Sequence, residues 1–105
     1  MCETPAQADA QRAAELVPVF RGNDAVIGQL SAATDGKHRV LAATIEGATA
    51  NGEHAGSEPD VATWIAYGDS ISEVTQAWDG QLRDGSAIDW ATARQVVLGC
   101  LAGGR

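Results

Sequence analysis

Glycine-centred breaks divide this chain into short segments, which excludes long helices. The 105 residues include 12 glycines, and several of these stand beside aspartate or asparagine, a combination typical of turns. The main breaks lie at residues 21–24, 35–36, 47–58, 68–69 and 84–86. No linker is long enough to separate two folding units, so we expect one domain spanning residues 1–105.

Both ends of the chain carry the pattern of a short helix. The segment Thr4–Gln7 resembles a capping box, and the helix that follows is expected to end near Val17, because Pro18 disfavours helix for the residue before it. Near the other end, Asp89 can cap a last helix. Its apolar residues recur at helical spacing: Trp90, Ala93, Val97 and Leu101.

The clearest helix signal lies in residues 70–82. Ser70–Glu73 has the sequence of a capping box, and a stop follows at residues 84–86. One apolar stripe at helical spacing runs through the segment: Ile71, Val74, Trp78 and Leu82. We expect a helix here.

The middle of the chain fits either helix or strand. Residues 26–34 and 37–48 show apolar residues at helical spacing, and their alanines favour helix. The same residues flank Asp35-Gly36, a strong hairpin turn signal, and residues 61–67 alternate as a strand does. We expect a mainly α fold of four to five short helices. The alternative is an α+β fold, with a three-stranded antiparallel meander (26–34, 37–46, 61–67) and three helices.

Negative charge is concentrated in the middle of the sequence. No lysine or arginine lies between Arg39 and Arg83, and the seven acids of that window equal the whole net charge of −7. Nucleic-acid binders place lysine and arginine on phosphates, so this charge argues against a nucleic-acid partner. A basic protein partner fits it better. The most apolar stretch near the end, residues 96–104, is too short to cross a membrane, so no membrane association is expected.

The sequence contains no motif for catalysis or cofactor binding. Gly-x-Ser-x-Gly, phosphate-binding glycine loops and His-Glu-x-x-His are all absent. Glu53 and His54, with Glu58 and Asp60, form a cluster of metal-type ligands, but their spacing matches no known metal-binding loop. We therefore expect no catalytic residues, no metal and no cofactor.

The two cysteines bear on the compartment. The first residues lack the basic and apolar regions of a secretory signal, so we expect cytoplasmic residence. Cys2 and Cys100 would then be reduced thiols, whereas a bridge between them would close nearly the whole chain and would require an oxidising compartment.

From these features we predict a small acidic regulatory protein, of the antitoxin, immunity or inhibitor kind, that binds a basic partner through its acidic middle. The expected partner-binding residues are Glu53, Glu58, Asp60, Trp64, Tyr67, Asp69 and Glu73. The alternative is a small α+β enzyme or ligand-binding domain whose site contains carboxylates and His54. A homodimer formed through the apolar last helix is compatible with both.

Overall fold

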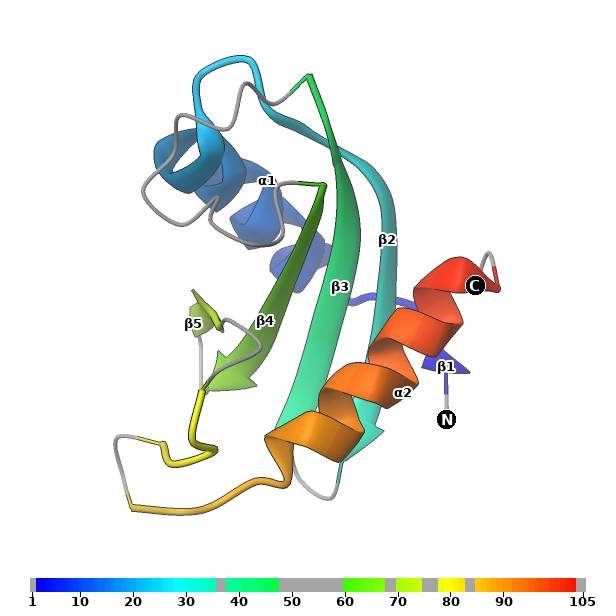
Figure 1. Cartoon of the computed structure of the whole chain (residues 1–105). Coiled ribbons are helices and arrows are strands. Elements are labelled where there is room, and N and C mark those ends of the chain that lie inside the picture. Colours follow the sequence, from blue (N-terminus) through cyan, green and yellow to red (C-terminus); the bar gives the residue numbers. More distant parts are fainter. Residues whose placement is uncertain are drawn as a thin grey trace.

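The computed structural model describes residues 2–35, 38–47, 60–67, 70–74, 78–82 and 85–103. Within those residues the chain forms a five-stranded antiparallel sheet with one helix on each face (Figure 1). The strands follow one another across the sheet in chain order, from β1 to β5. The elements are β1 Cys2–Glu3, α1 Gln7–Arg21, β2 Val26–Asp35, β3 His38–Glu46, β4 Val61–Tyr67, β5 Ser70–Glu73 and α2 Trp90–Ala102.

This α+β architecture shows that the mainly α prediction is wrong. The meander kept as the alternative is present in β2, β3 and β4, but in the described residues the sheet has two further strands and is covered by two helices, not three. Asp35 pairs with His38, so β2 and β3 form the hairpin that competed with the helical interpretation.

Burial on both sides of the sheet explains the error. α1 packs against β2 and β5 on one face, and α2 packs against β2 and β3 on the other. On β3, Leu41 and Ala43 join the core beneath α1, while Val40 and Ala42 join the core beneath α2. A strand with no solvent-facing side shows no alternation of polar and apolar residues, so its sequence does not identify it as a strand.

A β-bulge in β2 explains why the apolar residues of segment 26–34 have the spacing of a helix. Ile27 pairs with Ile45, whereas Leu30 pairs with Ala43, so β2 contains one extra residue between them. The bulge brings Ile27 and Leu30 against the same core although they stand three positions apart. Three positions is a helical interval, and in this case a bulge produces it.

The described residues of the segment 70–82 do not form the predicted helix. β5 takes the first four of them, and the apolar stripe divides between the two cores. Ile71 packs beneath α1, whereas Val74, Trp78 and Leu82 pack into the core beneath α2. There Trp78 meets Trp90 edge to face, with ring centroids 5.7 Å apart and an interplanar angle of 81°. The apolar residues of this stripe therefore belong to two different cores, one on each face of the sheet.

The terminal helices follow the sequence more closely. α2 begins as predicted, with the Asp89 carboxylate accepting the Thr92 N–H at 3.3 Å. α1 begins at Gln7 without a side-chain cap, so the capping box predicted there is wrong. It also continues through Pro18 to Arg21 instead of ending near Val17. The buried side chains of Val17 and Arg21 hold this last turn against the sheet despite the proline.

A disulfide joins the two ends of the described chain. Cys2 in β1 and Cys100 in α2 are bonded, with Cα atoms 5.6 Å apart and a sequence separation of 98. The prediction of two reduced thiols is therefore wrong. Of the helices in the described residues, neither is long and apolar enough to span a membrane.

Candidate interaction surface

The structure separates the predicted partner-binding residues from one another. Asp60 is exposed just before β4, Trp64 is fully buried, and Glu73 is held in a buried ion pair. The remaining predicted positions lie outside the described residues or, for Tyr67, have a side chain outside them: Glu53, Glu58, Tyr67 and Asp69.

Trp64 belongs to the core and cannot be an exposed contact for a partner. Its side chain has 0% exposure and lies in the core beneath α1. The cross-strand partners of Trp64 are Leu41 in β3 and Glu73 in β5. The indole Nε1 has no hydrogen-bond acceptor among the described residues. The large apolar ring is therefore used for packing, which is the ordinary use of tryptophan in a small core.

Glu73 is neutralised by Arg21, a residue that the sequence placed in a break. The Arg21 Nη2 atom lies 3.1 Å from Glu73 Oε2 and also donates to the Val61 carbonyl at 3.1 Å. The two side chains are only 4% and 6% exposed. Burying a charge costs roughly several kcal/mol unless an opposite charge compensates it, so these groups depend on one another. The pair fixes the end of α1 to β4 and β5 and adds no charge to the surface.

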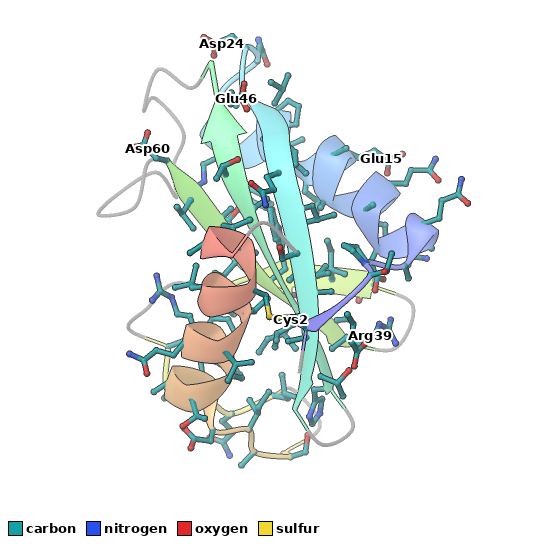
Figure 2. The ribbon with its side chains drawn as sticks, turned by 90° about the vertical axis from the view of Figure 1, so that its right-hand side faces the viewer. Cys2, Glu15, Asp24, Arg39, Glu46 and Asp60 are labelled. Atoms are coloured by element: carbon teal, nitrogen blue, oxygen red, sulfur yellow. A yellow bond between two sulfur atoms is a disulfide. The ribbon has the colours of Figure 1, made fainter. Side chains whose placement is uncertain are left out.

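A different group of acids gathers at one end of the sheet. Asp24 precedes β2, Glu46 ends β3 and Asp60 precedes β4. All three are exposed, and Figure 2 shows them at the same end of the molecule. We call Asp24, Glu46 and Asp60 the acidic end.

Backbone contacts hold the acidic end together. Val26 pairs with Glu46, and the Ile45 N–H donates to the Asp60 carbonyl at 2.8 Å. Gly47 has φ +72°, and a Cβ atom at this position would lie 2.5 Å from the Asp24 carbonyl oxygen. Only glycine allows so close an approach in that conformation. The three carboxylates therefore come from separate segments that are fixed relative to one another.

The charges toward the opposite end of the strands compensate one another. Arg39 Nε donates to Asp9 Oδ2 at 2.9 Å, and Arg12 Nη1 lies 3.9 Å from Asp9 Oδ1. The hydrogen bond to Asp9 and the charge of Asp9 raise the pKa of Arg39, and the charge of Glu3 adds to this. Glu3 in turn accepts a hydrogen bond from Thr34. Among the side chains that the structure describes, two cations and two anions meet here, in contrast to the acidic end.

Metal-ligand chemistry is limited in the described part of the chain, where no group of three or more histidine, cysteine, aspartate or glutamate side chains is placed to hold a metal ion. Glu53, His54 and Glu58, which the alternative ligand-binding interpretation requires, lie outside the described residues.

The chain matches no protein-family model, no curated protein and no solved structure. Function is therefore inferred from the geometry of the chain itself.

Proposed function

We propose that this protein is a small interaction module that binds a basic protein partner through its acidic end. The observation that carries the proposal is the convergence of three exposed carboxylates, Asp24, Glu46 and Asp60, from three chain segments. Carboxylates gathered in this way attract a basic surface, speed its encounter and select its orientation. The proposed class includes antitoxins, immunity proteins and inhibitors that recognise a basic partner.

The disulfide changes the compartment in which we propose that the module works. Bonds such as Cys2–Cys100 persist in oxidising compartments and are rare where thiol reductants are abundant. We therefore propose action in an oxidising environment, in place of the cytoplasm expected from the sequence. The partner should be sought there.

Charge-removal variants test the proposed surface. The tagged protein would capture partners from a native extract at low and at high salt, beside the variant Asp24→Asn/Asp60→Asn. Its matched control, Glu15→Gln/Asp79→Asn, also removes two exposed carboxylates, but from outside the acidic end. Glu46 is kept because its carboxylate lies over Gly28.

The proposal predicts salt-sensitive capture of a basic protein by the wild type and by the control. The acidic-end variant should bind that protein about 2- to 30-fold more weakly, from the usual strength of two exposed ion pairs. Equal binding by both variants at low salt would refute the proposed surface.

A further inference from the structure

The outer edge of β2 is only partly covered by the described chain. β1 pairs with β2 at Ala32 and Ala33, and among the described strands only β1 lies on that side. Residues 26–30 of β2 extend beyond this contact. Figure 2 looks onto this edge of the sheet, with β1 against the half of the strand that is farther from the acidic end. Half of a ten-residue strand therefore has an outer edge that no described strand pairs with.

The sequence of this edge does little to discourage pairing. An open strand edge offers N–H and C=O groups to any extended chain, and natural edges are commonly protected by lysine or proline. β2 contains no lysine, arginine or proline, and Val26 is 57% exposed. The bulge gives some protection, because it turns the Gln29 N–H inward, to Thr44 Oγ1 at 2.8 Å. Successive peptide groups alternate along a strand, so the next N–H, that of Leu30, points outward.

The acidic end lies directly beside the open part of the edge. Asp24 is two residues before Val26, and Glu46 is the cross-strand partner of Val26. A strand added along residues 26–30 would thus bring one of its ends to Asp24 and Glu46. Charge complementarity makes a basic segment the favoured occupant. A second copy of this chain would bring another net charge of −7 to the same place.

We propose that an extended, basic segment of the partner adds to the sheet along residues 26–30 of β2, with its lysine or arginine side chains at Asp24 and Glu46. This inference rests on the proposed function and supplies its binding mode. Main-chain hydrogen bonds to the strand edge provide affinity, and the carboxylates select charge and direction.

Backbone-methylated peptides test strand addition without changing charge. The probe is a fluorescent ten-residue peptide of alternating lysine and valine, long enough to pair with residues 26–30 and to extend past Val26 toward Asp24 and Glu46. Two control peptides carry N-methyl groups on one or the other alternate set of residues, so each lacks the N–H donors along one edge. Binding is measured by fluorescence anisotropy, and hydrogen exchange is followed at the amides of residues 26–30.

The unmethylated peptide is expected to bind and to slow exchange at these amides. One methylated peptide should bind at least tenfold more weakly, and Asp24→Asn/Asp60→Asn should weaken binding of the unmethylated peptide. If both methylated peptides bind as well as the parent while the acidic-end variant loses affinity, strand addition is refuted and the proposed function stands. If methylation weakens binding but the Asp24→Asn/Asp60→Asn substitutions leave the affinity unchanged, the edge is a docking site and the acidic end is not.

Two further outcomes also count against the proposal. Failure of every peptide to bind at low salt would overturn both strand addition and the acidic end. Dimerisation of the protein alone, with protection of the same amides, would show that a second copy occupies the edge and would refute a basic segment as its occupant.

Discussion

Removal of the Cys2–Cys100 disulfide is expected to lower the free energy of unfolding by about 4–5 kcal/mol. The bond closes a loop with a sequence separation of 98, and closing a loop of about 100 residues reduces the entropy of the unfolded chain by an amount worth about 4.7 kcal/mol. Domains are commonly stable by only about 5–15 kcal/mol, so this bond would account for a large part of the total. It also holds β1 and α2 against each other at the edge of the sheet.

The variant Cys2→Ser/Cys100→Ser can be compared with the oxidised wild type by urea unfolding, followed through circular dichroism and tryptophan fluorescence. A denaturant dependence of about 1–3 kcal/mol per molar urea predicts a midpoint lower by about 1–5 M. The wild type in reductant should match the variant. Reductant should leave the variant unchanged, which controls for effects of the reductant itself.

An unchanged midpoint would refute this reasoning, because it would mean that the cross-link does not restrict the unfolded chain. A variant that is unfolded even without urea would mean that the total free energy of unfolding of the wild type is smaller than the contribution of the bond. Thiol titration of the denatured wild type, with and without prior reduction, checks that the bond is present at the start.

Three further predictions follow from the packing, each measured by urea unfolding. Glu73→Ala should destabilise the fold by about 3–5 kcal/mol, because it leaves Arg21 charged and buried, whereas Arg21→Met/Glu73→Leu should recover most of the loss; equal stability of the two variants would contradict a coupled pair. Gly47→Ala should cost about 1–3 kcal/mol, since φ is +72° and the new Cβ would press on the Asp24 carbonyl; no loss would mean that this turn relaxes freely. Ala42→Leu should cost about 1–3 kcal/mol by overfilling the fully buried space between β3 and α2, and a neutral result would reveal unfilled volume there.

The parts of the fold that sequence could predict are those set by local interactions. The Asp89 cap and the apolar residues of α2 lie within one helix, so their pattern is readable. The hairpin of β2 and β3 was visible as an alternative because its turn signal is local. The choice between helix and strand failed because it depends on what covers each face of the sheet, and the covering helices are distant in sequence.

Long-range pairing also limited the prediction of the candidate site. Glu73 looked like a surface acid because its partner, Arg21, stands 52 residues away. Asp24 was outside the acidic window of the sequence, yet the start of β2 brings it to Glu46 and Asp60. The disulfide spans still more of the chain, and nothing local to either cysteine indicates the pairing. Of the predicted residues that the structure describes with their side chains, Asp60 is the one that stays at the proposed surface.

The order of the strands has a consequence for how the chain folds. From β2 to β5, each strand pairs with the strand that follows it in the sequence, so the sheet can grow by successive hairpins. Pairings between sequence neighbours close short loops and form fast, typically within microseconds for a single hairpin. Linking β1 to α2 requires the two ends of the described chain to meet, and forming a disulfide takes seconds or longer. Refolding from the reduced, unfolded state should therefore show a rapid phase that builds the sheet and a slow, oxidant-dependent phase that locks its edge.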